Sequence, residues 1–96
     1  MYDHIGLKAK DFGASVRFYA AVLAPLGHVK GSEGDGWAGF GPPGEPGLWL
    51  YAEKQTGGPG VHVAFRAKTR AEVDAFHRAG LAAGGRDNGA PGLRTD

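Results

Sequence analysis

The chain has 96 residues, with 11 basic and 10 acidic side chains, a formal net charge of +1 and no cysteine. A near-neutral chain of this length forms one small domain and lacks the basic footprint of proteins that bind nucleic acid or anionic membranes. The absence of cysteine excludes disulfides, zinc–thiolate sites and thiol nucleophiles. We therefore expect the partner to be a small molecule or a second copy of the chain.

The first expected element is a strand at residues 2–9. Its alternation places Ile5 and Leu7 on one face and His4, Gly6 and Lys8 on the other. No apolar stretch precedes it, so we expect no signal peptide or membrane span and a cytoplasmic location.

An amphipathic helix is expected next. Asp11 is a suitable N-cap, and apolar residues follow at spacings of three and four as far as the Pro25–Gly27 stop signal, at Phe12, Val16, Tyr19, Leu23 and Leu26. This stripe should cover Ile5 and Leu7 and leave the face with His4 open.

Residues 28–47 are rich in glycine and predict two short strands, at 28–31 and 37–40. A further strand is expected at residues 48–52. Its alternation places Leu48 and Leu50 toward the core, and Trp49 and Tyr51 together on the other face. The aromatic residues Trp37 and Phe40 fit either a ligand pocket or the core.

Residues 57–60 read Gly-Gly-Pro-Gly and predict a linker. After it, Val61, Val63 and Phe65 alternate with His62, Ala64 and Arg66, which predicts a strand. Thr69 and Glu72 form a capping box that opens a second helix, with an expected apolar stripe at Val73, Phe76 and Leu81. Residues 86–96 hold one short strand at most.

The two halves match at an offset of 58 residues, without a gap. His4 falls on His62, Phe18 on Phe76 and Gly27 on Gly85. This self-similarity predicts two copies of one supersecondary unit within a single domain at 1–96: a first unit at 1–56, the linker at 57–60 and a second unit at 61–96. The two histidines would then face each other across a pseudo-twofold axis.

The second unit is expected to be incomplete in this chain. The counterpart of the 48–52 strand would lie at 106–110, and two full units would need about 116 residues. Because a bare sheet edge exposes unpaired backbone groups, we expect either residues beyond Asp96 or strands from another chain, and we favour the first.

Four stretches of the sequence resemble the vicinal oxygen chelate superfamily, which includes glyoxalase I, extradiol dioxygenases, and the bleomycin and fosfomycin resistance proteins. They are Tyr2–Leu7, Arg17–Tyr19, Val22–Gly27 and Val61–Phe65. The resemblance implies an α+β fold of two tandem βαβββ units, which form a curved mixed sheet with helices outside.

The resemblance also implies that His4 and His62 bind a divalent metal. Imidazole suits iron, manganese, nickel and zinc, and such a metal acts as a Lewis acid on a substrate with two neighbouring oxygens. The superfamily takes a carboxylate from the last strand of a unit, where this chain offers only Glu53, which is either a ligand or a solvated acid. Strand histidines that bind no metal remain the alternative.

Substrate contacts are predicted for Trp49, Tyr51 and Arg66, where Arg66 would hold an anionic group or form a salt bridge at the sheet edge. His28 and His77 lie outside the repeat pairing and are expected on the surface. Three functions stay open: a metal-dependent lyase, isomerase or dioxygenase; a metal-free, antibiotic-type binding protein that works as a homodimer; and a fragment or short paralogue with an interaction role.

Overall fold

A computed structural model describes residues 1–54 and 61–93 of the chain. Its elements in chain order are β1 (Ile5–Ala9), α1 (Phe12–Leu23), the 3₁₀ helix η1 (Ala24–Leu26), β2 (Val29–Gly34), β3 (Trp37–Gly41), β4 (Leu48–Ala52) and α2 (Arg70–Ala82). The first unit is thus a complete βαβββ motif, and the expected α+β class is confirmed. The expected linker at 57–60 lies outside the described residues.

The four strands form one mixed sheet in the order β1-β4-β3-β2. β1 and β4 run parallel, which requires the crossover through α1, whereas β3 is antiparallel to both of its neighbours. The expected strand at residues 48–52 has these bounds, while the strand expected at 2–9 begins only at Ile5.

One face of the sheet carries the hydrophobic core. The alternation of each strand turns its buried residues toward α1, where they meet two fully buried residues of that helix. The core consists of Val22, Leu23, Ala38, Phe40, Leu48 and Leu50. The prediction that Leu48 and Leu50 belong to the core is confirmed.

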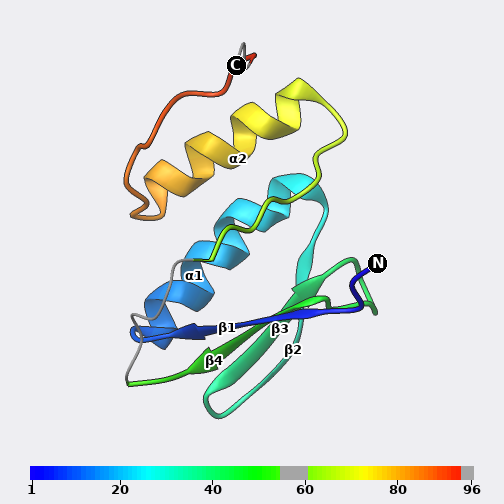
Figure 1. Ribbon diagram of the computed structural model, residues 1–96, viewed down its shortest axis with the longest axis vertical. Coiled ribbons are helices and arrows are strands. Elements are labelled where there is room, and N and C mark those ends of the chain that lie inside the picture. Colours follow the sequence, from blue (N-terminus) through cyan, green and yellow to red (C-terminus); the bar gives the residue numbers. More distant parts are fainter. Residues whose placement is uncertain (55–60, 94–96) are drawn as a thin grey trace.

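Helix α1 lies between the sheet and α2 (Figure 1). Asp11 caps it as expected, because its carboxylate accepts the Ala14 N–H at 3.1 Å. Tyr19 faces the sheet, with its ring centroid 6.4 Å from that of Phe40. Toward α2, Val22 and Phe18 approach Gly80. A helix that contacts two layers is apolar over most of its surface.

Helix α2 begins at the expected capping box. The Thr69 hydroxyl accepts the Glu72 N–H at 3.1 Å, and the Glu72 carboxylate accepts the Lys68 N–H at 2.7 Å. The predicted stripe is only partly correct, since Phe76 packs inward but Val73 and Leu81 are each 41% exposed. Neither helix in the described part of the chain is long and apolar enough to cross a membrane.

Residues 61–67 are extended but do not form the expected strand. The expected alternation holds from residue 62 onward, because Val63 and Phe65 are half-buried whereas His62, Ala64 and Arg66 are exposed. Val61, which was expected on the apolar face, is 72% exposed. Phe65 packs between Tyr19 and Phe76, with ring centroids 6.4 and 6.1 Å away. The segment therefore buries its apolar side against the helices and joins no described strand.

Candidate functional site

Three aromatic side chains share the sheet face that α1 does not cover. Trp49 lies opposite Gly6 on β1 and Gly39 on β3, and Tyr51 lies opposite Lys8 and Trp37. Residues paired directly across neighbouring strands point to the same side of a sheet. The prediction that Trp49 and Tyr51 share a face is thus confirmed, and Trp37 joins them. We call these three residues the aromatic face.

Glycines on the neighbouring strands let the rings lie close to the backbone. A Cβ at Gly39 would come within 2.7 Å of the Trp49 ring, and one at Gly6 within 3.2 Å of Tyr51 Cε2. A Cβ at Gly34 would overlap the Trp37 indole. Each ring therefore lies over a position that has no side chain, and this close contact with the sheet restricts the orientation of the ring.

The aromatic face is accessible to solvent in this structure. Trp37 is 36% exposed and Tyr51 45% exposed, while Trp49 is half-buried beside Trp37, at a centroid separation of 6.0 Å and an interplanar angle of 43°. Lys8, opposite Tyr51, supplies a cation at the β1 side. Tilted, half-exposed rings offer planar surfaces on which another aromatic molecule can stack.

His4 lies one residue before β1 and is exposed. Its Nδ1–H donates to the Asp3 carboxylate at 2.8 Å. This hydrogen bond fixes the tautomer in which Nε2 is free to accept a proton or a metal ion.

His62 and Arg66 lie on the outward side of the 61–67 segment. Because Phe65 of this segment packs on Tyr19, the segment lies on the α1 side of the sheet. The structure therefore does not bring Arg66 together with the aromatic face. His4 and His62 directly precede Ile5 and Val63, which line one pocket, and a metal shared by the two histidines stays a prediction.

Glu53, the carboxylate expected at the end of the last strand, directly follows β4 and is half-buried. Its backbone N–H donates to the Ala9 carbonyl at 3.0 Å, which continues the pairing of β1 with β4. Within residues 1–54 and 61–93, no three histidine, aspartate or glutamate side chains converge in a way that could hold a metal ion.

The two remaining histidines are not on the open surface, contrary to expectation. His28 is half-buried, and its Nδ1 is buried. The His77 side chain is 27% exposed, and its Nε2–H donates to the Asp87 carboxylate at 3.2 Å. The Gly89 N–H, at 2.9 Å, and His77 together lower the pKa of Asp87. This cluster ties the segment after α2 to the helix.

Sequence reasoning left Trp37 undecided between pocket and core, and it gave the glycines no role. The sequence signal that could have indicated the aromatic face is the alternation of glycine with aromatic residues in Trp37–Gly41, next to the alternation in Leu48–Ala52. Only the placement of the neighbouring strands shows that each ring lies against a glycine, on β3 for Trp49, on β1 for Tyr51 and on β2 for Trp37.

A solved structure decides the family. The crystal structure of a glyoxalase/bleomycin resistance protein from Albidiferax ferrireducens T118 matches 98% of this chain and 82% of its own, with a TM-score of 0.82 and 30% sequence identity. The chain belongs to the glyoxalase/bleomycin resistance protein family. No protein-family model and no curated protein matches the sequence.

In this glyoxalase/bleomycin resistance fold, the described second unit holds the extended segment and α2, and no strand follows α2 up to residue 93. The short strand considered for residues 86–96 is thus absent as far as residue 93.

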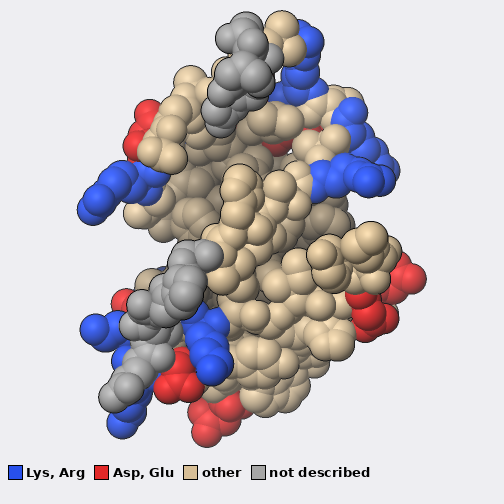
Figure 2. All heavy atoms as spheres, in the orientation of Figure 1, with Lys and Arg blue, Asp and Glu red and all other residues tan. Residues whose placement is uncertain are grey.

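On the face in view in Figure 2, basic and acidic side chains both lie around the rim, and the middle carries few charges. Basic side chains gather at the upper right of this view, and acidic side chains at the lower right.

Proposed function

We propose that this chain is a small-molecule binding protein that holds a planar aromatic ligand on its aromatic face without a metal. The observation that supports the proposal is the placement of Trp37, Trp49 and Tyr51 over glycines on the sheet face away from α1. Rings that are already oriented lose little conformational freedom when a ligand stacks on them. Lys8 beside Tyr51 favours a ligand that carries an anionic group.

A homodimer would enclose such a ligand. β1 pairs only with β4 in the described part of the chain, so its outer edge offers free backbone donors and acceptors. A second copy at this edge would extend the sheet and add its own aromatic face to the site. Sedimentation of the purified chain, alone and with ligand, tests this part of the proposal, and a monomer in both conditions would contradict it.

The chain provides a direct readout for binding, because its only two tryptophans both belong to the aromatic face. We would titrate the protein with 2-naphthoate and follow the two indole N–H signals by NMR. Cyclohexanecarboxylate, which has the charge but no planar ring, is the control ligand. Both indole signals should shift with the first ligand and stay in place with the second.

Tyr51→Ala should weaken naphthoate binding by roughly three- to tenfold, the range expected for one aromatic pair. Tyr2→Ala is the matched control, since Tyr2 is 80% exposed and lies before β1. Equal affinity in the two variants, or shifts confined to residues outside the aromatic face, would contradict the proposal.

The second candidate is a metal-dependent lyase, isomerase or dioxygenase acting on a substrate with vicinal oxygens. The hydrogen bond from His4 to Asp3 supports it, because carboxylates orient metal-binding imidazoles in this way. Equilibrium dialysis against nickel or manganese would show about one ion per chain, lost in His4→Ala and in His62→Ala but kept in His77→Ala. Equal metal content in all of these proteins would remove this candidate.

A further inference from the structure

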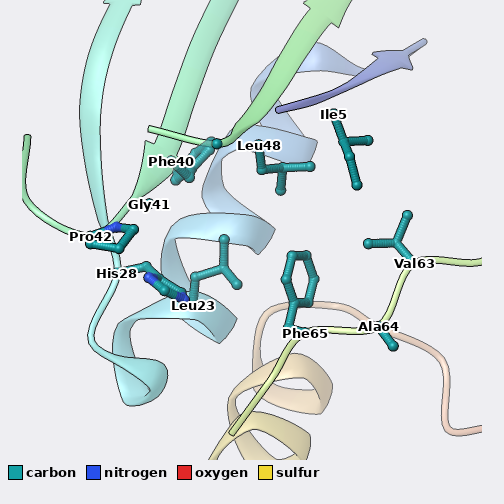
Figure 3. Close-up of a pocket in the computed structure, with 11 residues that line it drawn as sticks. Ile5, Leu23, His28, Phe40, Gly41, Pro42, Leu48, Val63, Ala64 and Phe65 are labelled. Atoms are coloured by element: carbon teal, nitrogen blue, oxygen red, sulfur yellow. The ribbon is translucent and has the colours of Figure 1, made fainter. Parts of the chain in front are cut away.

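Two hollows of the domain differ in the side chains that line them. The first, of about 210 Å³, lies between the end of the sheet, α1 and the 61–67 segment; apart from His28, the described side chains around it are apolar, and none is charged (Figure 3). The second, of about 150 Å³, lies at the end of α2, and charged and amide side chains line it, among them His77, Asp87 and Asn88. The second hollow therefore brings together groups that can take part in a reaction.

Asn88 is the only asparagine of the chain, and a glycine follows it. The residue is exposed, so water reaches its side-chain amide. Gly89 has no Cβ, and its φ of 132° lies in a region that other residues rarely adopt. Its backbone nitrogen can therefore approach the Asn88 side-chain carbonyl without steric hindrance. Asparagine is also among the residues that are chemically labile on heating.

This arrangement permits deamidation through a cyclic imide. The Gly89 backbone nitrogen loses its proton to a base from the solvent and attacks the side-chain carbonyl carbon of Asn88. The new C–N bond closes a succinimide ring, and the side-chain amide nitrogen leaves as ammonia. Water then opens the ring at either carbonyl, which yields aspartate or isoaspartate at position 88. The reaction consumes one water, releases one ammonia, and needs no oxidant or reductant.

The attacking nitrogen is engaged in a hydrogen bond in this structure. The Gly89 N–H donates to Asp87 Oδ1 at 2.9 Å, and His77 Nε2–H donates to the same oxygen at 3.2 Å. Both bonds favour the ionised carboxylate, and the pKa of Asp87 is lowered first by Gly89 and then by His77. Removing the proton would place an amide anion against this carboxylate, which is unfavourable because like charges repel. The nitrogen must therefore leave Asp87 before it can react.

We propose that Asn88 is a site of spontaneous deamidation, and that Asp87 slows the reaction by holding the Gly89 N–H. Both products add a negative charge beside Asp87. The isoaspartate also adds a methylene to the main chain, which moves the Gly89 N–H away from Asp87 and loosens the segment after α2. Helix α1 and the sheet lie between this site and the aromatic face, so the proposal does not depend on the function proposed above.

The intact mass of the protein measures the reaction, because no other asparagine contributes. The folded chain is incubated at mildly alkaline pH, and the mass gain from amide to acid is followed with time. Asp87→Ala should raise the rate by roughly three- to tenfold, as expected for the loss of one exposed hydrogen bond. Asp35→Ala is the matched control, since it removes an exposed carboxylate from the turn between β2 and β3. An unchanged or lower rate in Asp87→Ala would overturn the inference.

Two further measurements locate the reaction and guard against a loss of folding. The tryptic peptide of residues 87–94 should carry the mass gain, and Asn88→Gln should abolish it because the longer side chain disfavours ring closure. In guanidinium chloride, the unchanged chain and Asp87→Ala should react at one rate, faster than the folded unchanged chain. This comparison holds even if the alanine variant does not fold. A folded chain that reacts as fast as the denatured one, or a mass gain in another peptide, would overturn the inference.

Discussion

Trp49 lies against Gly39 of the neighbouring strand, so closely that a Cβ on Gly39 would come within 2.7 Å of the indole ring. The two residues are paired across β3 and β4. The absence of a side chain at one position thus sets the orientation of the ring at the other.

Gly39→Ala should therefore displace the Trp49 ring. Overpacking of this kind costs about 1–3 kcal/mol in the free energy of unfolding. Urea unfolding followed by tryptophan fluorescence measures it, and the native emission should also change because the indole is moved. Gly31→Ala is the matched control, because a Cβ there meets nothing within 4 Å. Similar losses in both variants would show that the ring is not held as described.

Phe65→Ala tests whether the 61–67 segment is docked on the helices. The ring packs against Tyr19 and Phe76 and is half-buried. Its removal should therefore lower the free energy of unfolding by about 2–3 kcal/mol, less than the truncation of a fully buried phenylalanine. Val61→Ala, at a residue that is 72% exposed, should change it by less than about 0.5 kcal/mol. Thermal or urea unfolding of the two variants gives the comparison, and an equal effect would contradict docking.

Burial raises the pKa of Tyr19 above its usual value of 10.0. The unfolded chain therefore loses this proton at a lower pH than the folded chain. The contribution of Tyr19 to stability is fully present below pH 10 and is lost as the pH rises through the folded-state pKa. Tyr19→Phe should lessen the fall in stability above pH 10, as measured by urea unfolding at several alkaline pH values. The same slope in both proteins would contradict the assignment.

The pKa of Asp87 is lowered from its usual 3.8, first by the Gly89 N–H and then by His77. Its contribution to stability is therefore present above pH 3.8 and is lost as the pH falls through the folded-state pKa. NMR should show the Gly89 amide signal moving only in strongly acidic solution. In Asp87→Asn, which keeps an acceptor but does not titrate, this movement should disappear. A midpoint at or above 3.8 would contradict the prediction.

The first unit was largely predictable, because local signals decide its elements. Asp11 and the three-to-four spacing up to Leu23 predict α1, and the alternation in Leu48–Ala52 predicts both faces of β4. The orientation of Trp49 and Tyr51 followed from this alternation alone. The close approach of each ring to a glycine did not, because it depends on how the strands lie beside one another.

The second unit was harder to predict, because its structure depends on partners that lie far away in the sequence. Alternation at Val61–Arg66 correctly predicts that Val63 and Phe65 are on the buried side, but not that Val61 is 72% exposed, and it does not say whether another strand is present for pairing. The burial of His28 Nδ1 likewise depends on the turn that follows η1, and the internal repeat pairs His28 with no histidine of the second unit. The predicted metal pair, His4 and His62, needs a measurement of bound metal.

The position of α1 between two layers has a consequence for how the sequence can vary. Most positions of α1 are buried or half-buried, so an enlargement or a charge there meets the sheet or α2, whereas Gly13, Arg17 and Ala20 are exposed. The outer side of α2 meets solvent and tolerates polar replacements. Changes that alter surface properties of the domain, such as charge or solubility, are therefore accommodated on α2 at Val73 and Leu81. Libraries that aim to diversify this fold would place their randomised codons at the exposed positions of Arg70–Ala82 and keep Phe76 and Gly80, which pack against other parts of the domain.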